Sequence, residues 1–213
     1  MVKTTAVLPT RDQRRDAIMQ VAREVFFEHG YSAASMSEIA ARLGGSKGTL
    51  YNYFKSKEEL FEAQVRDLCG HITEDALERG GIEGAPREVL ANFGERLLKH
   101  LYDGQSVKLF RVLVAEAQRS PELGRIFFEV GPARGRKGLE TYLESARARG
   151  LMNPPDCALA AEQFLSLCKG SAHLQFLLNL IPPLTAEEIH AHIGKAVDVM
   201  MALYGPKQPA AAS

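Results

Sequence analysis

The sequence predicts an all-α fold, and three observations support this prediction. Apolar residues recur with the helical spacing i, i+3, i+4 through almost every segment, whereas no segment keeps the alternation of a β-strand. Several of these segments follow a serine or threonine that has Glu or Gln three positions later, the pattern of an N-terminal capping box. Hydrophobic residues make up 46% and charged residues 24% of the 213-residue chain, as in ordinary globular proteins.

Four helices are expected in the N-terminal third of the chain. The first carries an apolar face that repeats every three to four residues from Ile18 to Phe26. Capping residues and glycines predict where the four helices begin and end. The helices begin after Thr10 and at Ser35, Ser46 and Ser56, and they end at Gly30, at Gly44-Gly45, at Phe54 and near Gly80.

More helices are expected after a glycine-rich break at residues 80–85. One proline, Pro132, cannot donate an N–H, so the helix there should be kinked or split. The stretch from Cys157 to Ile181 is apolar nearly all round, which predicts a helix buried on several faces. A last helix follows Thr185, which pairs with Glu188 in a capping box, and the residues from Gly205 onward form a frayed tail.

Charge is distributed unevenly, although the chain has 26 basic and 26 acidic residues. Up to Lys57 there are nine basic residues against five acidic ones, and the remainder has the opposite balance of four charges. A neutral total charge would weigh against nucleic-acid binding, but here the total is neutral only because the excess charges of the two segments cancel. The pattern predicts an N-terminal module that faces an anion, attached to a mildly acidic body.

Other classes of protein are disfavoured by what the sequence lacks. No apolar run reaches 18 residues and no apolar stretch precedes Arg11, so neither a membrane span nor a signal peptide is expected. The three cysteines form no CxxC pair, which favours buried core positions in a reducing cytoplasm. His190 and His192 face apart on a helix, and no catalytic constellation is visible. We therefore expect no metal, no cofactor and no enzymatic activity.

The second and third helices carry the residues best suited to a function. A short helix, a glycine turn and another short helix form the helix-turn-helix pattern. The third helix offers lysine and hydroxyl groups for phosphates and an asparagine for an adenine edge. Tyr51 is interpreted as facing DNA and Phe54 as core, while Arg11, Arg14 and Arg15 either solvate the first helix or reach DNA weakly.

This region resembles the N-terminal domain of TetR-type transcriptional regulators. The resemblance rests on Gly30-Tyr31, on residues 36–40 (MSEIA) and above all on residues 46–61 (SKGTLYNYFKSKEELF). The rest of the chain resembles the family in its helical layout, with a weaker similarity to the AcrR-like branch. One departure is Gly45, where the family commonly has a larger apolar residue, and this leaves the turn less well packed.

The resemblance implies an all-α homodimer in which a three-helix, helix-turn-helix domain binds double-stranded operator DNA. The C-terminal helical domain would dimerise and bind a small apolar effector. We expect domains at 1–57 and 58–204 and a flexible tail at 205–213. Carried over by position, the DNA-binding residues are Ser35, Ser46, Lys47, Gly48, Thr49, Tyr51, Asn52, Tyr53, Lys55 and Lys57.

Two further sets of residues are hypotheses about the C-terminal domain. A gap beside the Pro132 kink would form the effector pocket, and the last two helices would form a four-helix dimer interface. The pocket residues are Leu97, Phe110, Phe127, Tyr142 and Phe164. The interface residues are Phe164, Leu174, Leu178, Ile193, Val197 and Met200.

The favoured function is that of a cytoplasmic repressor released from its operator by the effector. Two alternatives stay open: a helical small-molecule-binding protein with a vestigial N-terminal module, and a regulator without an effector.

Overall fold

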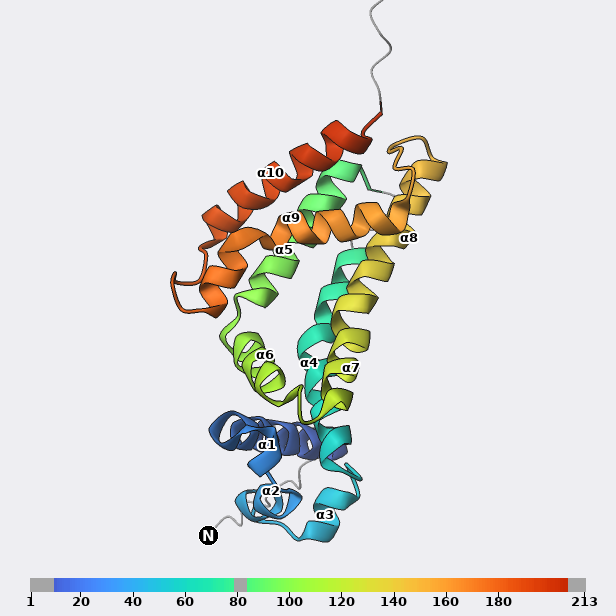
Figure 1. The fold of residues 1–213 in the computed structure, drawn as a ribbon. Coiled ribbons are helices and arrows are strands. Elements are labelled where there is room, and N and C mark those ends of the chain that lie inside the picture. Colours follow the sequence, from blue (N-terminus) through green and yellow to red (C-terminus); the bar gives the residue numbers. More distant parts are fainter. Residues whose placement is uncertain (1–9, 79–83, 207–213) are drawn as a thin grey trace, which may run out of the picture. The chain divides into compact units, whose positions relative to one another are not determined.

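A computed structural model describes residues 10–78 and 84–206, with side chains given outside 70–78. The described residues form helices and no strand, which confirms the all-α prediction (Figure 1). The helices are α1 Arg11–Ala33, α2 Met36–Arg42, α3 Lys47–Tyr51, α4 Lys57–Glu78, α5 Pro86–Leu101, α6 Gly104–Glu116, α7 Pro121–Phe128, the π-helical turn η1 Glu129–Ala133, α8 Arg134–Ala148, α9 Cys157–Leu177 and α10 Ala186–Tyr204. Most of the predicted glycine-rich break and of the predicted tail lies outside the described residues.

Helix ends follow the predicted capping residues. Thr10 and Thr185 form complete capping boxes, in which the threonine hydroxyl accepts the N–H of the third helical residue and that residue's side chain accepts the threonine N–H. Gly30 adopts a left-handed φ of 76° as predicted, but the helix resumes beyond it, so α1 continues through a kink to Ala33. At Pro132 the predicted break is a π-helical turn, which joins α7 to α8.

The chain divides into two compact units, and the division differs from the expected boundary after residue 57. The first unit contains residues 1–66 together with 108–127, and the second contains 67–107 and 128–213. Helices α4, α6 and α7 each contribute residues to both units. The first unit thus combines α1, the helix-turn-helix segment and the start of α4 with one stretch from later in the sequence, residues 108–127.

The core of the first unit lies between α1, the helix-turn-helix segment and the start of α4. An aromatic cluster at its centre consists of Phe26, Tyr31 and Phe61, whose ring centroids lie 5.4–6.0 Å apart. Gln64 is a fully buried polar residue that accepts a hydrogen bond from Arg23 and donates one to the Met19 carbonyl. Because both ends of the amide are bonded, α4 is held on α1 without an unpaired buried group.

The second unit is a helical bundle in which α5 packs against both α9 and α10, and α8 packs against α9. Its largest fully buried side chains include Phe93, Tyr142 and Phe164. Gly94 permits the close approach of α10, because a Cβ there would lie 2.9 Å from Ile193 side-chain atoms. None of the described helices has the length and apolar character needed to cross a membrane.

Candidate nucleic-acid interface

The helix-turn-helix segment is built on two serine caps and one left-handed glycine. Ser35 accepts the N–H of Glu38 at 3.1 Å at the start of α2, and Ser46 accepts the N–H of Thr49 at 3.2 Å at the start of α3. Between them Gly44 adopts a φ of 65°, a conformation that favours glycine. The turn and both helix starts are therefore set by local sequence.

One face of α3 and of the residues that follow it is fixed in the core, and this leaves the opposite face in solvent. Leu50 is 1% exposed and Phe54 is 2% exposed, which confirms the interpretation of Phe54 as core. Arg15 from α1 also covers the Phe54 ring, with its guanidinium carbon 5.5 Å from the ring centroid. Since α3 has only five residues, its orientation depends on this packing rather than on its own stability.

The exposed face contains most of the residues predicted to contact DNA. Tyr51 is 47% exposed, as an aromatic residue on a binding surface would be. Thr49 and Tyr53 are half-buried, and the Ser46 and Thr49 hydroxyls lie 3.1 Å apart. The exposed members of the set are Ser35, Ser46, Lys47, Gly48, Tyr51, Asn52 and Lys55.

Lys57 has a different role from the one predicted. Its ammonium donates to the carbonyls of Tyr31 at 2.8 Å and Ala34 at 3.0 Å, and lies 4.3 Å from the Tyr31 ring centroid. These carbonyls belong to the end of α1 and the residue after it, where helical partners are missing. The resemblance placed Lys57 among the DNA contacts. In the structure its ammonium instead bonds the carbonyls at the end of α1, and we correct the assignment accordingly.

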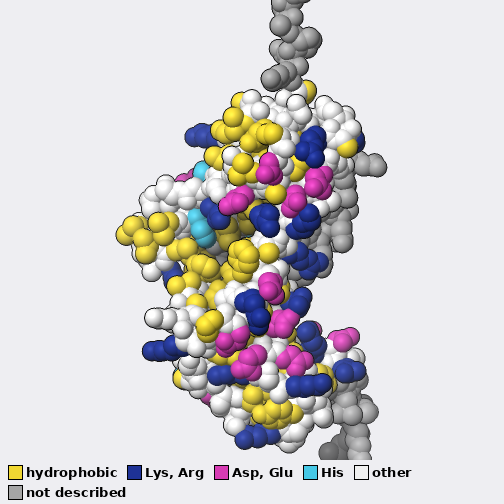
Figure 2. Space-filling model, turned by 45° about the vertical axis from the view of Figure 1, so that its right-hand side comes forward, with side chains coloured by type: hydrophobic (Ala, Val, Ile, Leu, Met, Phe, Trp, Pro, Cys, Tyr) yellow, Lys and Arg dark blue, Asp and Glu magenta, His cyan; other side chains and the backbone are white. Residues whose placement is uncertain are grey.

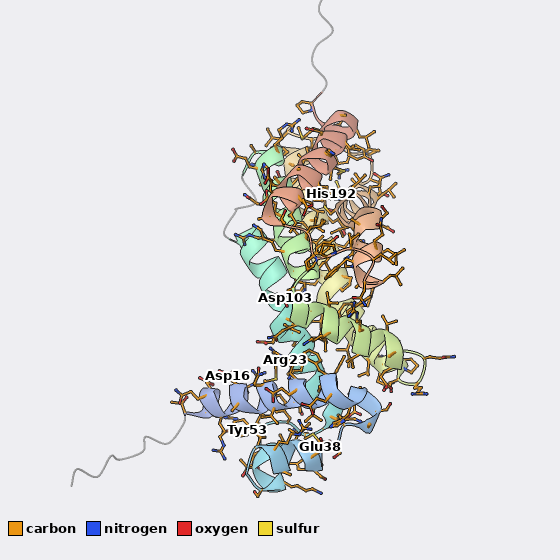
Figure 3. The ribbon with its side chains drawn as sticks, turned by 90° about the vertical axis from the view of Figure 1, so that its left-hand side faces the viewer. Asp16, Arg23, Glu38, Tyr53, Asp103 and His192 are labelled. Atoms are coloured by element: carbon orange, nitrogen blue, oxygen red, sulfur yellow. The ribbon has the colours of Figure 1, made fainter. Side chains whose placement is uncertain are left out.

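An ion-pair network that the sequence analysis did not single out joins α2 to α1. Arg42 donates to Glu28 at 2.7 Å and to Glu38 at 2.9 Å, and His29 lies 3.0 Å from Glu38. The hydrogen bond from Arg42 lowers the pKa of Glu28. Figure 3 labels Glu38 on α2, and Asp16 and Arg23 on α1. The Glu38–Arg42 spacing of four residues was the available sequence signal.

A small cavity lies behind the turn, next to Gly45. Its volume is about 10 Å³, and it is lined by Arg14, Ile18, Ala40, Leu43, Gly45, Ser46, Thr49 and Leu50. A Cβ built on Gly45 would lie 3.8 Å from the Arg14 guanidinium and would meet nothing closer. The space beside Gly45 is thus no larger than about one water molecule, and Arg14 and the start of α3 both line it.

Within the first unit, α6 is bonded to the end of α1. Glu116 on α6 is 7% exposed and accepts a hydrogen bond from the Ser32 hydroxyl. Tyr31 donates to Glu58 at 3.0 Å, and burial raises the pKa of its hydroxyl, with Glu58 adding to the effect. The kinked end of α1 is thus fixed by side chains from both α4 and α6.

The five predicted pocket residues do not come together in one unit. Phe110 and Phe127 are half-buried in the first unit, with ring centroids 5.7 Å apart. Leu97, Tyr142 and Phe164 belong to the second unit, and the latter two are fully buried in its core. Tyr142 already donates to the Gly84 carbonyl at 3.3 Å. The assignment of these five residues to an effector pocket stays a prediction.

Four of the six predicted interface residues are core residues of the same chain. Phe164, Ile193, Val197 and Met200 are at most 2% exposed, so a partner cannot reach them in the folded subunit. These residues are apolar because they pack against α5 and the rest of the bundle within one subunit. Their assignment to the dimer interface was therefore wrong. Leu174 and Leu178 differ, since they are 59% and 60% exposed.

The part of the chain that the structure describes holds no cluster of three or more potential metal ligands. The three cysteines are buried and unpaired, as predicted for small core residues. Burial raises the pKa of Cys69 to about 11 and that of Cys168 to about 12, so both thiols are protonated at neutral pH.

Two family models match the chain. Residues 18–64 match the model for bacterial regulatory proteins of the tetR family, and residues 88–206, more than half of the chain, match the C-terminal domain of AefR-like transcriptional repressors. The first match covers the helix-turn-helix segment described above, and the second covers α5 to α10.

Curated relatives and solved structures agree with these matches. The regulator BetI of Rhizobium meliloti is 34% identical over 53% of this chain and 56% of its own length. The repressor AcnR of Corynebacterium diphtheriae is 35% identical over 37% of this chain and 41% of its own length, so the chain spans about half of these relatives or less.

Two solved structures resemble the chain along their whole length. A TetR-family regulator from Mesorhizobium loti gives a TM-score of 0.78 at 28% identity, covering 92% of this chain and 100% of that one. The flavonoid-responsive regulator FrrA gives a TM-score of 0.77 at 33% identity with the same coverage. These relatives are transcriptional regulators rather than enzymes. Because the family models match both the helix-turn-helix segment and the C-terminal helices, this chain belongs to the TetR family of transcriptional regulators.

Proposed function

We propose that the protein is a homodimeric repressor that binds operator DNA through α3 and leaves it when a small aromatic effector binds. The observation that carries the DNA-binding part is the position of α3, which is held by buried Leu50 and Phe54 and presents Lys47, Tyr51 and Asn52 to solvent. A recognition helix needs this combination, because only a helix with a fixed orientation can read base edges.

The side chains of α3 and of the residues that follow it suit different parts of the duplex. Lys47 and Lys55 supply point charges for phosphates, and the hydroxyls of Thr49 and Tyr51 donate to phosphate oxygens. Asn52 is the residue suited to sequence readout, since its amide can bond both N6 and N7 of an adenine. Affinity would come mainly from the lysines and specificity mainly from Asn52.

Dimerisation is supported by exposed apolar side chains on α9 and α10. Leu159 is 50% exposed, Val199 41% and Leu203 61%. They line one shallow groove together with Glu162, Gln163, Ser166, Leu167 and Gly170. Figure 2 shows apolar side chains at the surface of this part of the molecule. We propose that a second copy covers this groove, because a symmetric operator needs two recognition helices about 34–36 Å apart or a multiple of that spacing.

Repression is favoured over activation by the extent of the two kinds of match. The activator FasR of Mycolicibacterium smegmatis is 53% identical, but over only 56 residues, or 26% of this chain. The match to the AefR-like repressor domain instead extends over residues 88–206. An aromatic effector is supported by FrrA, which responds to flavonoids. Such a ligand releases DNA only if it binds the non-operator state more tightly. We place the protein in the cytoplasm with its operator.

The test is operator binding at several salt concentrations. Footprinting on genomic DNA identifies the operator, and fluorescence anisotropy then gives the dissociation constant from 50 to 300 mM salt. Lys47→Ala should weaken binding to specific and nonspecific DNA alike and should lower the salt slope by about one unit. Lys137→Ala is the matched control, because that lysine pairs with Glu140 at 2.9 Å in the second unit. An unchanged slope for Lys47→Ala would remove this residue from the phosphate contacts.

A further inference from the structure

Two buried polar atoms of the second unit have no hydrogen-bond partner among the described residues. They are the hydroxyl oxygen of Tyr102, a residue that is 7% exposed, and Nδ1 of His173. Folded proteins rarely leave such atoms unpaired, because each loses its bonds to water and gains none in exchange. Two such atoms on neighbouring side chains therefore indicate a place where another molecule can bond.

Both atoms belong to one aromatic cluster. The Tyr102 ring lies 5.9 Å from the His173 ring in an edge-to-face arrangement and 4.6 Å from the Phe176 ring. Tyr102 is the residue after α5, where its N–H donates to the Leu98 carbonyl at 2.9 Å, so its backbone is fixed. A molecule bonded to the two polar atoms would meet aromatic rings around it, which suits a planar aromatic ligand.

His173 lies three residues after a break in α9 at Gly170. Gly170 has a φ of 51°, and the interruption frees the carbonyls of Leu167 and Cys168. The His192 Nε2, on α10, lies 3.1 Å and 2.9 Å from these two oxygens, and Figure 3 labels this residue. His192 thus stabilises the break, whereas the buried Nδ1 of His173 has no hydrogen-bond partner.

The two side chains are uncharged at neutral pH. Burial lowers the pKa of His173, with a smaller contribution from Lys169, and burial raises the pKa of Tyr102. A neutral imidazole nitrogen can accept a hydrogen bond, and a tyrosine hydroxyl can donate one. A hydroxyl group on a ligand has both capacities, since it can donate to His173 and accept from Tyr102. A carboxylate would lose its hydration on burial there, a cost that a neutral hydroxyl group does not incur to the same extent.

We propose that Tyr102 and His173 form the polar end of the effector site and select a neutral aromatic molecule that carries a hydroxyl group. This inference rests on the proposed function, in which an aromatic effector controls DNA binding. Phe176 supplies an aromatic wall, and the pair of polar atoms fixes the orientation of the ligand hydroxyl. A ligand of the same shape without the hydroxyl leaves both atoms unpaired and binds more weakly.

Calorimetric titration of the full-length protein with two matched probes tests the site. 2-Naphthol has the hydroxyl and 2-methylnaphthalene has a methyl group in its place, so only the hydrogen bonds differ. We expect the wild type to bind 2-naphthol about tenfold more tightly. Tyr102→Phe and His173→Phe should each remove this preference and leave the affinity for 2-methylnaphthalene unchanged. Tyr204→Phe is the control, because the Tyr204 hydroxyl already donates to Gln163 at 2.5 Å.

Three results would overturn the site: no heat from either probe up to millimolar concentration, equal affinities in the wild type, or a preference that survives in a folded Tyr102→Phe variant. The wild-type comparison needs no variant, so it stands even if a substitution fails to fold. Operator anisotropy separates the two proposals. Tyr102-dependent binding of 2-naphthol without DNA release keeps the site and refutes the effector-release mechanism. Release by another compound with unchanged sensitivity in Tyr102→Phe keeps that mechanism and refutes the site.

Discussion

The helix-turn-helix segment and the α9–α10 pair differ in how far local sequence determines which side chains are exposed. In the first, two serine caps and the left-handed Gly44 fix helices of five to seven residues, and the outward face follows. In the second, apolar residues surround both helices, and neighbouring helices decide which of them are covered. Phe164 is fully buried while Leu159, on the same helix, is 50% exposed. Long apolar helices therefore need the tertiary structure before their faces can be assigned.

The largest expected effect is on stability, from truncation of Phe164. The ring is fully buried and lies 6.5 Å from the Phe93 ring, so Phe164→Ala should lower the free energy of unfolding of the second unit by about 3–5 kcal/mol. Urea denaturation followed by circular dichroism measures this change. A variant that keeps wild-type stability but becomes monomeric would return Phe164 to the dimer interface.

Leu203, on α10, is the exposed counterpart of the buried Phe164, since it is 61% exposed. Leu203→Glu would replace an apolar contact of the proposed dimer groove with a second carboxylate besides that of Glu162. It should therefore give monomers and weaken operator binding at least about 100-fold through the loss of one recognition helix. Analytical ultracentrifugation and anisotropy measure both effects. Thermal stability of the monomer should change little, and Ala202→Glu, an exposed neighbour, serves as the control. An intact dimer would contradict the proposed groove.

Inside the DNA-binding segment, Lys57 and Lys55 allow a similar comparison between a side chain that is bonded within the fold and one that is exposed. Its ammonium bonds carbonyls at the end of α1, so Lys57→Met should cost about 1–2 kcal/mol of stability, less than a fully buried bond because the side chain is partly exposed. The salt slope of operator binding should stay unchanged. Lys55→Met is the matched variant and should show the opposite behaviour: unchanged stability and a reduced slope. A reduced slope for Lys57→Met would restore it to the phosphate contacts.

The sequence predicted most of the fold and part of the site, for identifiable reasons. Capping boxes at Thr10 and Thr185 depend on residues three positions apart, and such local contacts can be seen in sequence. The role of Lys57 could not be predicted, because its partners lie about 25 positions earlier. The unpaired atoms of Tyr102, just after α5, and of His173, on α9, belong to segments that only the tertiary fold brings together. The same holds for residues 108–127, which belong to the first unit.

The smallest expected effect concerns the cavity beside Gly45. A Cβ there meets only the Arg14 guanidinium at 3.8 Å, and Gly45 is not among the residues with positive φ, so Gly45→Ala should fit without strain. It should raise stability by about 0.4–1 kcal/mol, because it restricts the unfolded chain and reduces the void. Gly44→Ala is the control and should destabilise, since Gly44 has a φ of 65°. Hydrogen exchange of the α2 and α3 amides measures both changes locally.

Operator affinity of Gly45→Ala then decides what the cavity is for. If the variant is more stable and binds DNA as the wild type does, the void is a packing defect behind a recognition helix that is already held by Leu50 and Phe54. Weaker binding by a stabilised variant would mean that Arg14, whose guanidinium the new methyl group contacts and restricts, binds the DNA backbone. That outcome would add α1 to the interface, and Arg14→Ala should then reproduce the loss and lower the salt slope by about one unit.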